Sequence, residues 1–598
     1  MTDSRHCIFL AAACAFVLPL QIGASEPSRA QPVPDWSATT TSKLVAALAV
    51  RANVLPPVTL ANGIAPLPGG RVTAFSSVRL PAAAPAYFAP HYQSALKAPL
   101  PAVIFLQSGI PATIPQTEWD LDPAGLTASY QPKGATKTAT NAFFQQLGTN
   151  GRSCATCHQP QNGMGVSVSD IRIRYLQTLG QDPIFAPVDG ANCPSAVARA
   201  ATSGSLLGNL LGRGAASFQS AHSLLLTRGL IRIFLPVPQA AEFTIQTVTD
   251  PNGCNTDPTY DQVINTDGSV SQIISVYRRP LISANLGFVT DTGANHGNLP
   301  PIDLVTGQPL TPDPINGGFE SGNIMWDGRE PTLQSQAIDA TLSHAQALTE
   351  PTTAQVNQMV AFENGIFTAQ TFSAGGGWLQ LAGGKGGPLD LSTFPTGNAV
   401  SLTTVTDGVP MNLYSVYSAS KNSVLTSIAR GQHIFDTRTF VVTNVAGFND
   451  AVGNSPTQGP SSAATCGLCH NQINSGADSI AVGQHDIGTG GGSVGFGGPA
   501  PDSALPIFRL TCLNATTTPY HGAVVLTNDP GKALITGKCA DIGRKTIPQL
   551  RALSSRAPYF SDGSASTLLD VVNFYNTRFR MALSARDKAD LVNFLAAL

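Results

Sequence analysis

The sequence predicts a mainly α-helical protein with two domains of one kind, a β-containing insertion and an extended N-terminal arm. Three observations lead to this prediction. A Cys-x-x-Cys-His pattern occurs twice, at Cys154–His158 and at Cys466–His470. Apolar residues recur at helical spacing near each copy. In a segment between the two copies, β-branched residues alternate with polar ones as they do in strands.

The N-terminal segment has the pattern of a secretory signal. Residues 1–24 begin with the basic Arg5, continue with an apolar run and end in small residues suited to cleavage. The run is short for a membrane span and Pro19 interrupts it, so we expect removal rather than a membrane anchor. No later stretch is long and apolar enough to span a membrane. The sequence therefore predicts an exported protein, periplasmic or secreted.

Composition limits the partners of the chain. Only 12% of the 598 residues are charged and the net charge is -2, which argues against nucleic acid or an anionic membrane as a partner. Residues 25–138 are rich in Pro, Ala, Ser and Thr. We interpret them as an extended arm that wraps other parts of the chain, because they lack the pattern of a separate catalytic domain.

The repeated motif has the spacing that attaches a c-type haem. Its two thiols add to the haem vinyl groups, and the adjacent histidine is placed to ligate the iron. Two Cys-x-x-Cys pairs also suit a structural zinc site, but these pairs lie far apart and each is followed at once by histidine. We therefore predict two covalently bound haem c groups, held by Cys154, Cys157, His158, Cys466, Cys469 and His470.

The other cysteines suggest disulfide bonds. The chain has 10 cysteines, of which Cys7 and Cys14 lie in the signal segment and four belong to the motifs. An even remainder in an oxidising compartment favours disulfides over free buried thiols. Pairing Cys193 with Cys254, and Cys512 with Cys539, keeps each bridge within one domain.

The first domain is expected at residues 139–420, with the insertion at about 159–275. Before the first motif, Phe143 and Phe144 lie on one face of a helix-like segment that ends in glycines. The later block MWDGREPTLQSQA reads as a turn followed by a helix, with Pro331 in the first helical turn.

The second domain is expected at residues 421–598. It contains the second motif and a Gly-rich loop at 488–498. It ends in a helix that carries Leu591, Phe594 and Leu595 on one face.

Three sequence blocks suggest a relationship. RRPLISAN, MWDGREPTLQSQA and IPQLRALSSRAPYFSDGSASTLLDVVNFY occur in this order around the two motifs. They resemble the bacterial dihaem cytochrome c peroxidase and MauG superfamily over about half of the chain. The arm and the insertion lie outside the resemblance, and in these the chain resembles the large secreted rubber-cleaving dihaem oxygenases of that superfamily. The resemblance implies two cytochrome c-like domains.

The resemblance also implies roles for residues after the first motif. Trp326 matches the tryptophan between the two haems, where an indole can relay electrons; otherwise it is a core aromatic. Arg329 would pair with haem propionates or with Asp327, or form a plain surface ion pair.

The expected proton-transfer group of the first haem pocket is absent. Gln336 matches a glutamine of that pocket, but Gln346 stands where the family peroxidases have an acid–base glutamate. An amide cannot shuttle a proton as a carboxylate does. His344 could do so, although on a helix it would face away from Gln346 and could be a solvent-facing residue.

The second haem is implied to have a tyrosine ligand. Tyr575 stands where family peroxidases carry an axial methionine, and a phenolate favours ferric iron. Met581 is an alternative ligand, and Tyr575 could instead be a core residue. The family also binds calcium, and Asn285 with the carbonyls of Arg556 and Pro558 matches those positions.

The first iron is expected to be open to peroxide, dioxygen or carbon monoxide. No histidine lies between His158 and His222, and His222 and His296 have no matching context. The sequence thus favours an exported dihaem peroxidase-like oxidoreductase, supplied with electrons by a small redox protein or a quinol-linked donor. The alternatives are oxygenation of an apolar substrate and pure electron transfer by two six-coordinate haems.

Overall fold

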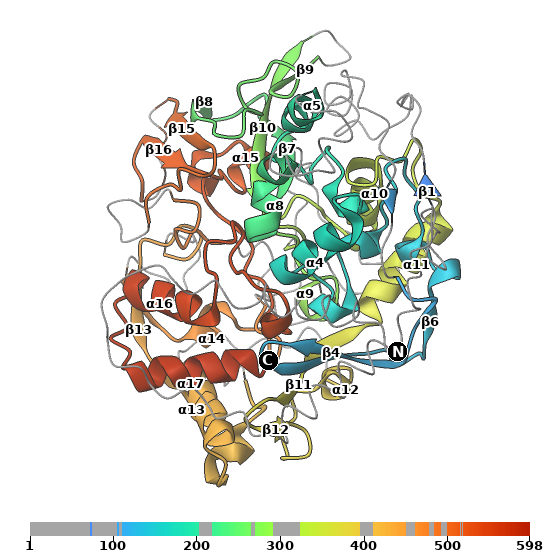
Figure 1. The fold of residues 1–598 in the computed structure, drawn as a ribbon. Helices are drawn as coiled ribbons and strands as arrows, with labels where there is room; N and C mark the ends of the chain where they lie inside the picture. The colour runs from blue at the N-terminus through green and yellow to red at the C-terminus, as the bar shows by residue number, and fades with distance from the viewer. Residues whose placement is uncertain are drawn as a thin grey trace, which may run out of the picture. The chain divides into compact units, whose positions relative to one another are not determined.

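The structure is a computed structural model, shown in Figure 1. It describes residues 72–73, 105–106, 110–202, 218–264, 269–290, 323–394, 411–449, 461–477, 484–491, 499–514, 516, 518 and 520–598. The chain divides into the units Met1–Pro68 and Gly69–Leu598, and every described residue belongs to the second. The predicted signal, most of the predicted arm and His296 therefore lie outside the described residues.

The prediction of a mainly α-helical protein is wrong. Among the described residues, strands form antiparallel sheets of two to four strands in the arm, in the insertion and in the second domain. Many of these strands are short and pair with partners far away in the sequence. Periodicity within one segment cannot reveal such pairing, because a strand is stabilised by its neighbours in the sheet.

The end of the predicted arm belongs to a sheet with a later part of the chain. In this sheet, of order β12-β11-β5-β4, the arm supplies β4 and β5. The bounds are β4 Thr117–Asp122, β5 Gly125–Tyr130, β11 Phe367–Ser373 and β12 Gly377–Trp378. Two further pairings of two-residue strands are β1 Val72–Thr73 with β2 Phe105–Leu106, and β3 Thr113–Ile114 with β6 Thr136–Lys137.

Short helices surround the first motif. Thr332 caps α10 by accepting a hydrogen bond from the Ser335 amide, so Pro331 precedes the cap and does not lie in the first turn as predicted. A capping box at Thr352 starts the next helix, α11. The bounds are η1 Thr138–Thr140, η2 Ala142–Phe144, η3 Cys154–Thr156, η4 Pro160–Asn162, α9 Gly287–Thr290, α10 Leu333–Ser343 and α11 Thr353–Asn364.

The insertion mixes helices and strands and is not self-contained. Its strands form the sheet β7-β10-β9, whereas β8 pairs with β15 of the second domain. A shared apolar core joins the two parts, including Leu235 and Leu510. The bounds are α4 Val168–Thr178, η5 Pro183–Phe185, α5 Pro194–Thr202, α8 Ser223–Arg228, β7 Ile231–Pro236, β8 Phe243–Thr249, β9 Gln262–Ile264 and β10 Val270–Arg278.

The second domain contains the longest described helix, α13, which packs against the closing helix α17 (Figure 1). Its helices are α13 Ser423–Thr437, α14 Cys466–Cys469, α15 Ala533–Thr536, η7 Cys539–Asp541, η8 Leu553–Ser555, α16 Leu568–Arg578 and α17 Ala585–Ala596. Two short helices, α12 Pro388–Leu391 and η6 Ser415–Ala419, precede its predicted start. The strands are β13 Phe440–Thr443, β14 Ser461–Ala464, β15 Ile507–Cys512 and β16 Val524–Thr527.

Both predicted disulfides are confirmed. Cys193 is bonded to Cys254, and Cys512 is bonded to Cys539. The expectation about membranes is also confirmed for the part of the chain that the structure describes, where no helix has the length and apolar character of a membrane span.

Candidate functional site

A large cavity lies beside each Cys-x-x-Cys-His motif. Cys154, Cys157 and His158 line the first cavity, which encloses about 1610 Å³ and is partly open to solvent. The second cavity encloses about 1680 Å³ and is lined by the residues of the second motif, Cys466, Cys469 and His470. Each motif thus borders a cavity of its own, and the two cavities are similar in size.

The two motif histidines are held in the same way. Nδ1 of His158 hydrogen-bonds the carbonyl of Met164 at 3.0 Å, and Nδ1 of His470 hydrogen-bonds the carbonyl of Gly476 at 2.6 Å. Such a bond fixes the tautomer of a metal-ligating histidine and leaves Nε2 for the metal. Burial lowers the pKa of His158 to about 4, so its ring is the neutral form that metals bind.

The four motif cysteines form no disulfide with one another, whereas the other four described cysteines are disulfide-bonded. Burial raises the pKa of Cys154, and burial raises the pKa of Cys466 to about 12. The thiols therefore stay protonated in the cavity walls. Two thiols at Cys-x-x-Cys spacing and an adjacent imidazole oriented through Nδ1, all at the edge of a cavity, are the features that a covalently attached haem requires, so the residues fit this group at both sites.

The surroundings of the two histidines correspond to one another. The ring of Phe143 lies 6.5 Å from that of His158 and 4.7 Å from Phe362 of α11. In the second domain, the ring of Phe435 lies 6.1 Å from His470 and 5.5 Å from Phe594 of α17. Each motif thus has a phenylalanine from a preceding helix, backed by a phenylalanine from a helix that follows the motif.

The two cavities share a wall. Trp326 lines both of them, and its Nε1 donates a hydrogen bond of 2.7 Å to the carbonyl of Arg279. This bond fixes the indole between the two motifs. The other residues that line both cavities are Arg279, Pro280, Leu281, Ile282, Thr546, Ile547, Pro548, Gln549 and Arg556.

The arginines that line the first cavity differ in their partners. Arg329 lines the first cavity, and its Nη1 lies 3.0 and 3.2 Å from the two carboxylate oxygens of Asp327. The Asp327 pairing considered for Arg329 is therefore the one observed, and this ion pair is buried rather than at the surface.

Arg279 and Arg556 are buried cations of the shared wall. Within the described ranges neither pairs with a carboxylate: Arg279 donates to the carbonyls of Arg228, Val166 and Arg556. Burial lowers the pKa of Arg279 to about 9 and that of Arg556 to about 10. A carboxylate on a bound group, such as a haem propionate, would supply the missing counter-charge.

Two of the three groups considered for calcium, those of Asn285 and Arg556, already have protein partners. The amide of Asn285 bonds both the N–H and the carbonyl of Thr368 and also Gln549, while the Arg556 carbonyl accepts from the Arg279 guanidinium. A cationic side chain already lies against one of the three expected ligands. These residues, as arranged, do not fit calcium.

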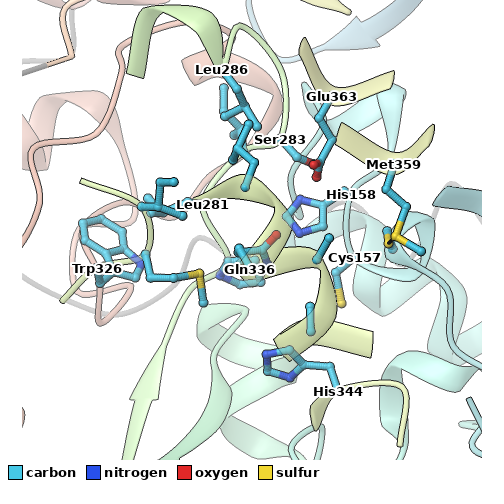
Figure 2. Close-up of a pocket in the computed structure, with 18 of the residues that line it drawn as sticks. Cys157, His158, Leu281, Ser283, Leu286, Trp326, Gln336, His344, Met359 and Glu363 are labelled. Carbon is cyan, nitrogen blue, oxygen red and sulfur yellow. Dashed lines mark hydrogen bonds between the residues drawn. The ribbon is translucent and has the colours of Figure 1, made fainter. Parts of the chain in front are cut away.

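Polar residues of the first cavity surround His158 in Figure 2. Gln336 lies on α10 and His344 follows its last residue, and both line the cavity. Gln346 lies beyond the helix with a φ of 57° and is not among the described residues that line the cavity. The structure thus brings two of these three sequence-predicted residues to the site.

Glu363 is a cavity residue that the sequence analysis missed. It lies on α11 and is 6% exposed, and its Oε2 has no hydrogen-bond partner in the described part of the chain. Burial raises its pKa from 4.5 to about 8. A signal was present: Val356, Met359, Val360 and Glu363 share one face by helical spacing, so the carboxyl interrupts a buried apolar stripe.

The second cavity contains both residues considered as ligands of its metal. Tyr575 of α16 and Met581, which follows that helix, line it together with His470. Burial raises the pKa of Tyr575. The geometry brings both candidates to the cavity wall and leaves the choice between them to experiment.

His222 does not reach the first cavity. Its Nδ1 and Nε2 lie 2.9 and 3.1 Å from the carbonyls of Phe218 and Phe185, and its ring stacks on Phe218. Burial lowers its pKa to about 4. It is a core histidine of the insertion.

The described residues contain no cluster of three or more His, Cys, Asp or Glu side chains able to hold a bare metal ion. No protein-family model matches the sequence, and no curated protein matches it either.

Proposed function

We propose that the chain is an exported dihaem c-type oxidoreductase of the peroxidase kind, which reduces peroxide or uses it to oxidise a partner. One observation carries the proposal. Each Cys-x-x-Cys-His motif borders a large cavity with its cysteines outside any disulfide and its histidine Nδ1 held by a carbonyl, and Trp326 lines both cavities. Two linked redox centres explain this arrangement.

The residues that line the two cavities have different roles in the proposed function. A haem bound at each motif would supply the redox chemistry. His158 and His470 orient the two groups, and Arg279 and Arg556 neutralise their carboxylates in the shared wall. Trp326 lies between the cavities, where an aromatic side chain can relay an electron.

Proton transfer favours peroxide chemistry at the first cavity. The oxygenase alternative drew on the absence of an acid–base residue, because Gln346 replaces a glutamate. The first cavity nevertheless contains His344 and Glu363, and each can exchange a proton with a bound substrate. General acid–base catalysis of this kind contributes roughly 10²- to 10⁴-fold to a rate.

The decisive experiment uses the full-length exported protein. Mass spectrometry and haemochrome absorbance should give two haems per chain. The electron paramagnetic resonance spectrum of the ferric protein should contain a high-spin signal that disappears on addition of hydrogen peroxide. Two low-spin signals that peroxide leaves unchanged would indicate an electron carrier, and dioxygen uptake with a polyisoprenoid but no peroxide turnover would indicate an oxygenase.

Variants assign the signals to the cavities. Replacing Cys154 and Cys157 by serine should remove the peroxide response and retain the second haem. The matched change of Cys466 and Cys469 to serine should retain the high-spin ferric signal. A protein that loses the peroxide response only in the second variant would contradict the assigned roles.

We predict that Tyr575 is a ligand at the second cavity. Tyr575→Phe should shift the optical and paramagnetic spectra of the second haem, because the oxygen ligand is lost, and raise its potential. The matched change Met581→Leu should leave both unaltered. The reverse pattern would assign the ligand to Met581.

A further inference from the structure

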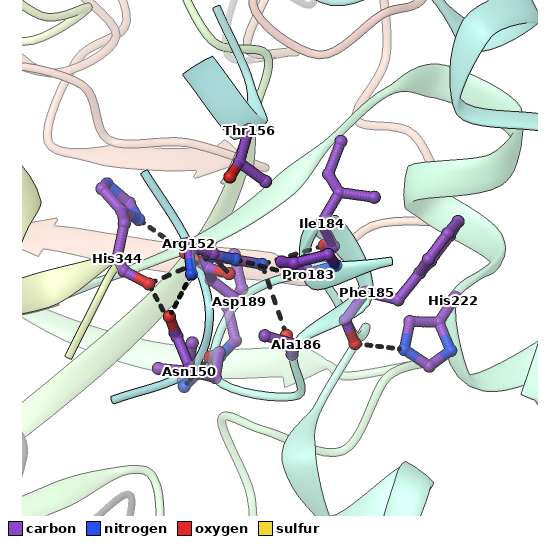
Figure 3. A network of polar contacts seen from close by, with 12 residues as sticks. Asn150, Arg152, Thr156, Pro183, Ile184, Phe185, Ala186, Asp189, His222 and His344 are labelled. Atoms are coloured by element: carbon purple, nitrogen blue, oxygen red, sulfur yellow. Dashed lines mark hydrogen bonds and ion pairs between the residues drawn. The ribbon is translucent and has the colours of Figure 1, made fainter. Parts of the chain in front are cut away.

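Asp189 is a buried carboxylate of the insertion that reaches the first cavity. Its side chain is 1% exposed, and its Oδ2 lies 2.5 Å from Nδ1 of His344, which is 24% exposed (Figure 3). Both residues line the first cavity. A histidine whose second nitrogen faces a cavity while a carboxylate holds the first is the arrangement of an oriented acid–base group.

Arg152 keeps Asp189 in place. Its Nη1 pairs with the other oxygen of the carboxylate, and its remaining donors bond the carbonyls of Pro183 and Ile184 at 2.7 and 2.9 Å. Burial by itself would raise the pKa of Asp189, but Arg152 and the His344 bond outweigh this effect and lower it. The residue is therefore an anion that accepts the His344 Nδ1–H.

The main chain of His344 is fixed as well. Its carbonyl accepts hydrogen bonds from Asn150 at 2.7 Å and from Arg152 at 3.3 Å, and its amide bonds the carbonyl of Ala340 at 3.0 Å. The ring thus has one defined orientation and one defined tautomer. The Nδ1–H points to Asp189, and Nε2 is left as a proton acceptor.

We propose that Asp189 is a positioning residue that holds His344 as the acid–base group of the first cavity, so that the insertion completes the catalytic site. This proposal rests on the proposed function. Gln346 stands where the family peroxidases have an acid–base glutamate, and the proposal assigns that proton transfer to His344. It also gives the inserted segment a role in the chemistry.

The proton balance of the step is simple. His344 Nε2 takes the proton from one oxygen of hydrogen peroxide and returns it to the other, which leaves as water when the O–O bond breaks. Haem groups held at the motifs would supply the two electrons that this cleavage consumes, and the external electron donor of the proposed function would replace them. While the imidazole holds the proton, the Asp189 carboxylate stabilises its positive charge.

The test compares a ligand that must release a proton when it binds haem with one that binds without proton transfer. Hydrogen cyanide must lose a proton on binding ferric haem, whereas carbon monoxide binds ferrous haem without proton transfer. Asp189→Asn and His344→Gln should each slow cyanide binding and the peroxide reaction by about 10- to 100-fold. Both should leave the carbon monoxide rate within about twofold, because the cavity is retained.

Controls separate positioning from folding. His433→Gln changes an exposed histidine of α13 outside both cavities and should leave all three rates unaltered. Because Asp189→Asn leaves Arg152 buried without a counter-ion, the double change Arg152→Gln with Asp189→Asn removes both charges. This double variant should also slow cyanide binding and the peroxide reaction while retaining the carbon monoxide rate.

Two results would overturn the proposal. One is unchanged cyanide and peroxide rates in both single variants, and the other is an equal loss of the carbon monoxide rate, which would indicate a merely structural role. Failure of the proposed function has a different signature. A wild-type protein that binds cyanide but does not react with peroxide would refute the peroxidase, while the cyanide comparison would still decide the role of Asp189.

Discussion

At the residue scale, the buried environment of Glu363 changes the protonation of its carboxyl group. It lies on the buried face of α11 with Oε2 unbonded among the described residues, and burial raises its pKa to about 8. Desolvation disfavours the charged form of a carboxyl. The first cavity therefore contains a neutral acid near neutral pH, and it is also lined by the imidazole that Asp189 holds.

Glu363 should make stability depend on pH. The folded-state pKa lies above the ordinary value of 4.5, so the folded protein retains the proton, and stability falls as pH rises from about 4.5 to about 8. Glu363→Gln should remove this loss. At pH 9 its free energy of unfolding should exceed that of the wild type by roughly 2–4 kcal/mol, whereas at pH 5 the two should differ little. Urea unfolding at pH 5, 7 and 9 measures the effect. Glu350→Gln, at an exposed position, is the control, and an equal pH dependence in both variants would refute the assignment.

At the element scale, the contact between α13 and α17 depends on one glycine. A Cβ on Gly431 would lie 2.0 Å from the carbonyl oxygen of Asp590 and 2.6 Å from the Cβ of Phe594. Nearby, Arg430 binds Asp590 through two hydrogen bonds of 2.7 Å. The backbones thus approach more closely than any side chain at position 431 would allow.

Gly431→Ala should therefore destabilise the second domain. Alanine favours a helix by about 1 kcal/mol over glycine, but the clash with the backbone of α17 requires the helices to separate. We expect a net loss of roughly 1–3 kcal/mol in the free energy of unfolding, measured by urea denaturation. His433→Ala, at an exposed position of α13, should show no such loss. Increased stability of Gly431→Ala would contradict the close approach.

At the scale of the whole molecule, the insertion is joined to the rest of the described chain in several ways. β8 extends a sheet of the second domain, Asp189 contacts His344, and buried Arg278 bonds both Asp327 and Asp529. The insertion is thus part of the site rather than an appendage.

Disulfide removal tests this integration. Serine at Cys193 and Cys254, whose sequence separation is 61, should lower the free energy of unfolding by about 2–5 kcal/mol. The matched change at Cys512 and Cys539, with a separation of 27, should cost about 0.7 kcal/mol less if loop entropy dominates. Non-reducing urea denaturation measures both. Separate unfolding of the insertion, with an unchanged haem spectrum, would contradict the integration.

Local patterns accounted for a definite part of the structure. The even number of remaining cysteines led to both disulfides, and helical spacing located α10 and α17. The predicted start of α10 was wrong because Thr332 caps the helix, so that Pro331 lies before the cap. The mainly α class failed because strands such as β5 and β8 are stabilised by distant partners.

The sequence by itself determined the chemistry available at each motif, because thiols and an imidazole at fixed spacing act together in any fold that exposes them to one cavity. Only the tertiary structure decided which groups meet them. Asp189 and His344 are far apart along the chain and adjacent in space, and Gln346 lies close to His344 in sequence yet outside the cavity lining. The physical reason is that strand pairing and the ends of helices determine where these side chains lie. Both depend on contacts between distant parts of the chain, which a local sequence pattern cannot predict.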